Sequence, residues 1–272
     1  AASFDASDGD QWTLSAAVAG LLRDGLSIDA ITLAGGGTIS RGDLQSVTAD
    51  LDATASGIAH ANADLARALG EDLTVSASLV SQEGEALRLT RLEVEGAGLQ
   101  LTAQGQVGGV EAGFPVDGSL RLISDDISRF SGLSGQSLSG AAEVTVTGRA
   151  TALSGAFDAD VIARTTGLGI GMAQIDPLLG GETVLEATAR RDEDGTTLDR
   201  FVITNDAVSA TAKGTIDRNA ANLDLQARLS ELSLVMPELS GPATLDAAIR
   251  WAKDAPVILD RLEAEAMGTH LR

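Results

Sequence analysis

The sequence contains no cysteine and only two histidines, His60 and His270, which lie far apart along the chain. These absences exclude a metal site built from histidine and cysteine ligands, and they exclude a cysteine nucleophile. The serine-rich segment 131–137 has no Gly-x-Ser-x-Gly elbow, which argues against a serine hydrolase. We therefore expect no catalytic residues, no metal and no cofactor, in a protein that is not an enzyme.

Aromatic residues are scarce as well. They make up 3% of the chain and tyrosine is absent, whereas 44% of the residues are hydrophobic and 31 are glycine. Apolar surface must therefore be built mainly from alanine, valine, leucine and isoleucine, whose slim side chains would line any interior. A chain of 272 residues is long enough to bury a substantial apolar surface, so we expect a folded protein.

Basic residues are few in comparison with acidic ones. Lysine and arginine total 19 and aspartate and glutamate 39, which gives a formal net charge of -20. Binding to nucleic acid needs basic side chains that displace counterions from phosphates, so we expect no nucleic-acid partner. The charge also disfavours docking on anionic lipid headgroups, and it is typical of a solvated exterior that keeps β-rich molecules apart.

Long hydrophobic runs are lacking too. The longest nearly unbroken run, residues 14–22, has about half the length that a membrane-spanning helix needs. The first residues contain no methionine and no basic leader, and the last residues look like an interrupted strand. We therefore interpret the chain as an internal fragment of a longer protein.

The chain repeats itself. Residues 89–92 (LTRL) recur as residues 198–201 (LDRF) and as residues 259–262 (LDRL), with further matches shifted by about 100 to 110 residues. We therefore predict one continuous repetitive β segment over residues 1–272. Its approximate repeat units are 1–40 (partial), 41–150, 151–250 and 251–272 (partial).

Within a unit the dominant period is two, which is typical of strands with one apolar face. In segment 99–107, for example, Leu99, Leu101 and Val107 alternate with glutamine and threonine. Turn signals separate such runs at hairpin distances, so we expect an antiparallel meander. These signals are Glu83-Gly84, Asp117-Gly118, Asp194-Gly195 and Asp217-Arg218-Asn219.

Helical patterns are short. They cover 62–69, 125–133 behind an aspartate cap, 172–179 and, weakly, 229–239, which is too little to cover a sheet. Two glycine tracts have simple structural interpretations. We expect a turn or bulge at 35–37 and a strand bend at 167–171.

A sheet with one apolar face must pack on a second sheet, close on itself or curl into a trough. A period near 110 favours several hairpins in one continuous sheet, and about twenty strands side by side would extend on the order of 100 Å. We predict a long, curled antiparallel sheet whose apolar interior forms a groove, although the pattern alone fits the dry core of a β-sandwich equally well. The predicted groove residues are Leu73, Val75, Leu92, Val94, Leu99, Leu101, Val107, Leu120, Leu122, Val144, Val146, Phe201, Ile203, Val208, Ala210, Ile216, Leu223, Leu225, Leu245 and Ile249.

Arginine and tryptophan leave alternatives open. The repeated tetrapeptides place Arg91, Arg200 and Arg261 beside apolar neighbours. We expect outward-facing side chains paired with nearby acids, and the alternative is lipid-headgroup contact at a groove rim. Trp12 and Trp251 are expected to pack in a core or at a sheet edge, with lipid contact as the alternative.

Three segments together resemble the repeats of TamB-type translocation and assembly module proteins. They are residues 178–183 (LLGGET), 192–201 (DEDGTTLDRF) and 210–217 (ATAKGTID), and the resemblance extends over residues 14–262. It implies a protein that is anchored in the inner membrane and crosses the periplasm of a Gram-negative bacterium. The implied fold is a β-taco with an apolar groove, and a broader resemblance to AsmA-like lipid-transfer proteins implies the same mechanism.

The resemblance implies carriage of phospholipid toward the outer membrane and a role in outer-membrane biogenesis. The implied partners are phospholipid in the groove and TamA, a BamA-like outer-membrane barrel that is met through a C-terminal domain outside this segment. The expected function is therefore a periplasmic bridge that shelters acyl chains. The alternatives are a scaffold for outer-membrane protein assembly that carries no lipid, and a passive structural β-repeat protein.

Overall fold

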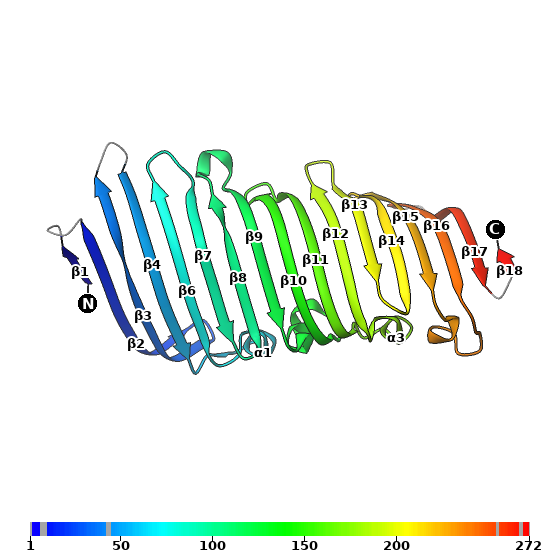
Figure 1. Ribbon diagram of the computed structural model, residues 1–272, viewed down its shortest axis with the longest axis horizontal. Helices are drawn as coiled ribbons and strands as arrows, with labels where there is room; N and C mark the ends of the chain where they lie inside the picture. The colour runs from blue at the N-terminus through cyan, green and yellow to red at the C-terminus, as the bar shows by residue number, and fades with distance from the viewer. Residues whose placement is uncertain (1, 6–9, 42–44, 254–255, 267–268, 272) are drawn as a thin grey trace. The chain divides into compact units, whose positions relative to one another are not determined.

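A computed structural model describes residues 2–5, 10–41, 45–253, 256–266 and 269–271. These residues form many strands and a few short helices, which confirms the predicted mainly β class. The chain divides into two compact units, unit 1 with residues 1–136 and unit 2 with residues 137–272. Within each unit the strands lie side by side in an antiparallel sheet (Figure 1).

In the described part of unit 1, the strands pair in the order β1-β2-β3-β4-β6-β7-β8-β9, and the short β5 pairs with the beginning of β3. This order is the meander that the turn signals predict. The strands are β1 Ala2–Asp5, β2 Gln11–Arg23, β3 Leu26–Arg41, β4 Gln45–Ser56, β5 Ala59–His60, β6 Leu73–Gln82, β7 Leu87–Gly96, β8 Leu99–Val107 and β9 Pro115–Ser124.

In the described part of unit 2, each strand pairs with the next one along the chain, from β10 to β18. The strands are β10 Ser139–Thr151, β11 Ala156–Gly169, β12 Glu182–Arg191, β13 Thr196–Thr204, β14 Val208–Ile216, β15 Ala220–Leu229, β16 Ala243–Ala252, β17 Ile258–Ala266 and β18 Thr269–Leu271. Within either unit, none of the described pairings joins the first strand to the last, so neither ladder closes into a barrel.

The register gives each sheet one apolar face. In unit 1, Ala77 of β6 pairs with Leu51 of β4 on one side and with Leu92 of β7 on the other. Residues that are directly opposite share a face, and their sequence neighbours point the other way. The neighbouring pair Ser78 and Asp50 is polar, and the Ser78 hydroxyl donates to the Asp50 carboxylate at 2.6 Å. We call these two sides the apolar face and the polar face of unit 1.

Unit 2 has the same division. Ala212 of β14 pairs with Phe201 of β13 and with Leu225 of β15, and these residues define its apolar face. The next residue, Lys213, pairs with Asp224 on the polar face. The alternation of the sequence is thus preserved from strand to strand, which is the condition for burying one face selectively.

Except for η1, which lies at the opposite end in the connection from β8 to β9, the short helices gather at one end of the strands in each unit, which we call the helix end (Figure 1). The opposite end, which carries turns such as 83–86 and 192–195, is called the hairpin end. At the helix end Asn62 caps α1 and Asp126 caps η2, as the predicted helical segments 62–69 and 125–133 require. The helices are α1 Ala63–Leu69, η2 Ile127–Phe130 and α2 Ser131–Ser134 in unit 1, and α3 Asp176–Leu179 and η3 Leu232–Leu234 in unit 2; η1 Val110–Ala112 lies in the connection from β8 to β9.

The repeated tetrapeptides coincide with β-bulges. In the first copy Leu89 and Leu92 both lie on the apolar face although they are three residues apart, because the register shifts between them on both sides of β7. The second copy repeats this shift in β13, and the third in β17 against β16. Two apolar residues at a spacing of three share a face only if one extra residue bulges out of the ladder. The repeat is therefore the sequence signature of a bulge.

Two local predictions are wrong. The tract Gly35–37 forms no turn or bulge but lies inside β3, where a Cβ on Gly37 would collide with the carbonyl oxygen of Thr48. Asp117-Gly118 lies inside β9 and not in a turn. Gly118 pairs with Gly105, and a Cβ there would meet the backbone of β8. Glycine serves close approach of neighbouring strands at both places. The tract 167–171 does bend the chain, as expected, with positive φ at Gly167 and at Gly171.

Candidate functional site

The apolar face of each unit carries all of the predicted groove residues. In unit 1 the register aligns Leu73, Val75, Leu92, Val94, Leu99, Leu101, Val107, Leu120 and Leu122 on that face. In unit 2 it aligns Val144, Val146, Phe201, Ile203, Val208, Ala210, Ile216, Leu223, Leu225, Leu245 and Ile249. Their placement on one face follows from the register, whereas their contact with lipid stays a prediction.

The prediction omitted further members of the same face. Leu33, Leu51 and Leu79 in unit 1, and Val161 and Leu185 in unit 2, share it by register. Each of them stands two residues from another apolar residue of its strand. Consistent use of the two-residue period would therefore have found them.

Among the residues that the structure describes, helices cover the apolar face at the helix end. In unit 2 the hydroxyl of Thr183, which is 2% exposed, donates to the carbonyl oxygen of Leu179 in α3 at 3.4 Å. The side-chain amide of Asn205 donates to Leu178 at 2.6 Å and to the Thr183 hydroxyl at 2.8 Å, which ties α3 to the turn after β13. In unit 1 Ser124 is 2% exposed and donates to the carbonyl oxygen of Asp126. The helices thus form a local cap over the ends of the strands.

The hairpin end of the apolar face is open. Val47, Leu87 and Val116 in unit 1 are about two-fifths exposed at strand positions near that end, and Ile216 in unit 2 is 45% exposed. The total accessible surface is 16718 Å². A compact protein of 27.7 kDa exposes about 11,000 Å², so this chain leaves considerably more of its surface accessible than a compact protein of the same mass does.

Both tryptophans stand on the apolar face. Trp12 pairs with Gly37, and its indole N–H donates across β3 to the carbonyl oxygen of Thr48 at 3.2 Å. Trp251 pairs with Ala221 near the hairpin end and is 37% exposed. Trp12 is therefore held by packing within the sheet, which agrees with the expected role of the tryptophans in packing. Trp251 leaves much of its ring accessible.

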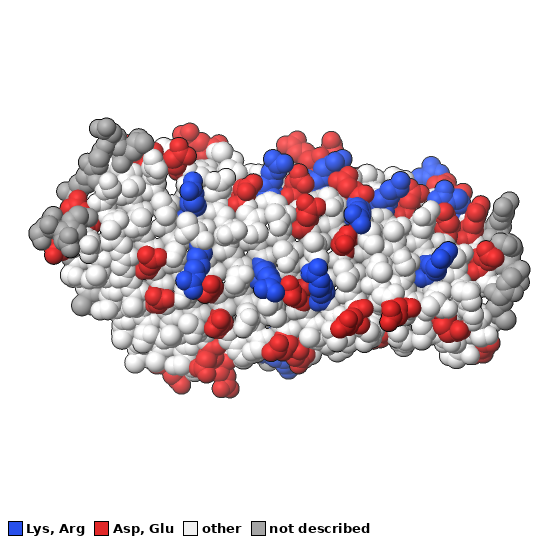
Figure 2. Space-filling model, viewed as in Figure 1, with Lys and Arg blue, Asp and Glu red and all other residues white. Residues whose placement is uncertain are grey.

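The polar face carries the repeated arginines. Arg91 pairs with Glu93 on its own strand, Arg200 pairs with Glu186 of β12 at 2.9 Å, and Arg261 pairs with Asp246 of β16 at 2.6 Å. The prediction of outward-facing arginines paired with acids is confirmed. These side chains face away from the apolar surface, because the register places all three on the polar face. Figure 2 shows charged side chains of both signs scattered among uncharged ones.

Hydrogen bonds shift the pKa values of several exposed charges. The bond from Arg91 lowers the pKa of Glu93, and the same bond raises the pKa of Arg91. At the helix end the backbone N–H of Ser128 lowers the pKa of Asp126 in unit 1, and the backbone N–H of Gly241 lowers the pKa of Glu231 in unit 2. The hydrogen bonds to these three carboxylates therefore favour their ionised form.

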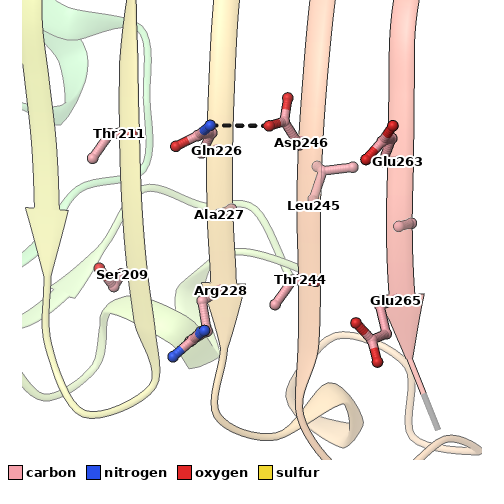
Figure 3. A pocket seen from close by; sticks show the side chains of 11 residues that line it. Ser209, Thr211, Gln226, Ala227, Arg228, Thr244, Leu245, Asp246, Glu263 and Glu265 are labelled. Atoms are coloured by element: carbon pink, nitrogen blue, oxygen red, sulfur yellow. Dashed lines mark hydrogen bonds between the residues drawn. The ribbon is translucent and has the colours of Figure 1, made fainter. Parts of the chain in front are cut away.

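A shallow hollow of about 400 Å³ lies on the polar face of unit 2 (Figure 3). Its side chains come from β14 to β17 and include Gln226, Arg228, Asp246 and Glu263. Asp246 accepts from Gln226 at 2.9 Å and from Arg261 at 2.6 Å, so its carboxylate is already occupied. Among the described residues, no group of three or more His, Cys, Asp or Glu is arranged to hold a metal ion.

Within the described ranges, none of the helices has the length and apolar character needed to cross a bilayer. Comparisons of the chain with protein-family models, with curated proteins and with solved structures find no match. The open apolar face is therefore the feature on which a functional proposal must rest.

Proposed function

We propose that the apolar face holds the acyl chains of phospholipids, and that the chain is a segment of a TamB-like bridge in the Gram-negative periplasm. In this proposal the parent protein is anchored in the inner membrane, and lipid moves along the bridge between the inner and outer membranes. The observation that carries the proposal is the accessible apolar face, which half-buried strand residues form in both units and which helices cover only at one end.

The energetics favour an acyl chain as the occupant. Each CH₂ group that is sheltered from water contributes about 0.8 kcal/mol, so a lipid with two chains gains strongly from even partial burial. Curling of the sheet around the lipid, as in a β-taco, would increase that burial, and this curl is part of the proposal. Slim side chains leave room for the chains, and a face of similar residues along its length lets a lipid slide, because no position is strongly preferred.

The experiment is lipid extraction from the purified chain after expression in the periplasm, with quantification by mass spectrometry. We expect phospholipid to accompany the wild-type chain. Leu101→Asp in unit 1 and Ala210→Asp in unit 2 should each lower the amount of phospholipid that is extracted. The double variant should lower this amount about tenfold. The reason is that a carboxylate loses its hydration next to an acyl chain.

Matched controls place the same charge one residue away. Thr102 and Thr211 are exposed on the polar faces of the same strands, so Thr102→Asp and Thr211→Asp should leave bound lipid unchanged. Circular dichroism should find equal strand content in all variants. A wild-type chain without phospholipid would overturn the proposal, and cross-linked polypeptide in its place would favour the scaffold alternative.

A further inference from the structure

In the described part of unit 2, a single charged residue stands on the apolar face. Among its strand positions that the structure describes, only Arg191 combines a formal charge with a place on that face. Arg191 pairs with Phe157 of β11 and with Thr196 of β13, both members of the apolar face. Its immediate neighbour Arg190 lies on the polar face and pairs with Asp199 at 3.4 Å.

Arg191 is exposed and forms no ion pair with the described residues, whereas most other strand arginines of unit 2 have carboxylate partners. The nearest turn carboxylates are engaged by their own backbones. Asp192 accepts from the N–H groups of Asp194 and Gly195, and Asp217 accepts from Asn219 and Ala220. The guanidinium group is therefore available to an anion at the border of an apolar surface, which is an arrangement suited to phosphate esters.

The position of Arg191 along the strand matters. It is the last residue of β12, at the open hairpin end, whereas Thr183 lies under α3 at the covered helix end. Strands rise by about 3.4 Å per residue, so residues 183 and 191 lie about 27 Å apart. An acyl chain spans about 15 Å, which is half of the hydrocarbon core of a bilayer. If the phosphate of a lipid lies at Arg191, its acyl chains can therefore lie along the apolar face without reaching the helices at the helix end.

We propose that Arg191 binds the phosphate of a phospholipid headgroup, so that the headgroup lies at the hairpin end and the acyl chains point toward the helix end of unit 2. This inference rests on the proposed function and deepens it, because it assigns an orientation and a headgroup contact. In unit 1 the corresponding place near the end of β6 is occupied by Ser81, which pairs with Val47. Unit 1 therefore has no such anchor at that place.

The test is isothermal titration calorimetry on the purified chain with two soluble short-chain lipids, dioctanoyl phosphatidylethanolamine and dioctanoylglycerol. They have the same chains, and only the first has a phosphate. The wild-type chain should bind the phospholipid about fivefold more tightly, as expected for a charged hydrogen bond at an exposed site. Arg191→Ser should abolish this preference and leave dioctanoylglycerol binding unchanged, whereas Arg191→Lys should retain part of the preference.

Arg228 provides the matched control. It is exposed, lies on the polar face of β15 and has no ion pair among the described residues, so Arg228→Ser removes the same charge from the opposite face. That variant should keep the full preference. An unchanged preference in Arg191→Ser overturns the anchor while leaving the proposed function intact. Failure of both lipids to bind overturns the proposed function itself.

A third ligand separates a lipid headgroup from a free phosphate ester. Glycerol phosphate, which has no acyl chains, should not displace the phospholipid at equal concentration, because the chains supply most of the binding. Equal displacement by glycerol phosphate that is lost in Arg191→Ser would identify a site for soluble phosphates and overturn the lipid orientation.

Discussion

The two faces of each sheet are made by the same strands, yet they differ in how their side chains are stabilised. On the apolar face, residues such as Leu101 and Leu225 are half-buried by their cross-strand neighbours, with helices over the strand ends alone. On the polar face, exposed arginines and carboxylates form ion pairs, for example Arg200 with Glu186. Neighbouring positions in the sequence therefore have different energetic roles, and a change at one face should cost far more than the same change at the other.

Deletion of one residue from β13 should have the largest effect on the difference between the two faces. Val202 lies in the regular part of the strand, and its deletion moves apolar side chains to the polar face, so we expect a loss of about 4 kcal/mol or more in stability. Asp199 lies in the bulge, and its deletion leaves Leu198 and Phe201 two residues apart on the apolar face. That deletion should cost only about 1 kcal/mol.

Urea unfolding followed by circular dichroism measures both deletion variants. A comparable loss of stability in the two would show that the bulge is needed for more than the alignment of its flanking residues, and it would contradict our interpretation of the repeated tetrapeptide.

Truncation of neighbouring side chains in β15 has the next largest effect. Leu225→Ala removes apolar surface that is only half-buried. We expect it to lower the free energy of unfolding by about 2 kcal/mol, because larger losses occur where the leucine is completely buried. Gln226→Ala removes an exposed hydrogen bond to Asp246 and should cost about 0.5 kcal/mol. Both values come from urea midpoints, and the order of the two variants is the decisive result.

Removal of an ion pair from the polar face has a smaller effect. Arg261 lies 2.6 Å from Asp246 and 3.7 Å from Asp224, but its side chain is 46% exposed. Arg261→Gln should therefore cost less than about 1 kcal/mol at low salt, and the difference should vanish at high salt because ions screen the pair. A loss that persists in concentrated salt would indicate packing by the arginine stem.

Of these perturbations, acid should have the smallest effect on stability, and it should act on the polar face. The bond from Arg91 lowers the pKa of Glu93. The stabilisation is therefore complete above the pKa of an unfolded glutamate, and it disappears as the pH falls through the lower pKa of the folded protein. Lowering the pH from 6 to 3 should therefore lower the thermal unfolding temperature of the wild type slightly more than that of Glu93→Gln. An equal response of the two proteins would contradict this role of Glu93.

The sequence predicts the faces well because strand alternation is a local pattern. It predicts an aspartate cap for the segment 125–133 for the same reason, since a capping side chain binds N–H groups two or three residues away, and Asp126 provides this cap. The roles of Gly37 and Gly118 depend on strands that lie opposite to them, so local turn chemistry gave the wrong interpretation. Arg191 is adjacent to Arg190 and to a turn, and only the register separates the two arginines by face.

The positions of the two tryptophans make the chain its own spectroscopic reporter. The sequence has no tyrosine, so its near-ultraviolet emission comes from Trp12 in unit 1 and Trp251 in unit 2. Both rings stand on apolar faces, with Trp12 hydrogen-bonded across β3 and Trp251 more than one-third exposed. Lipids with brominated acyl chains, which quench indole fluorescence on contact, would therefore report occupancy of either unit separately once the other tryptophan is replaced by phenylalanine.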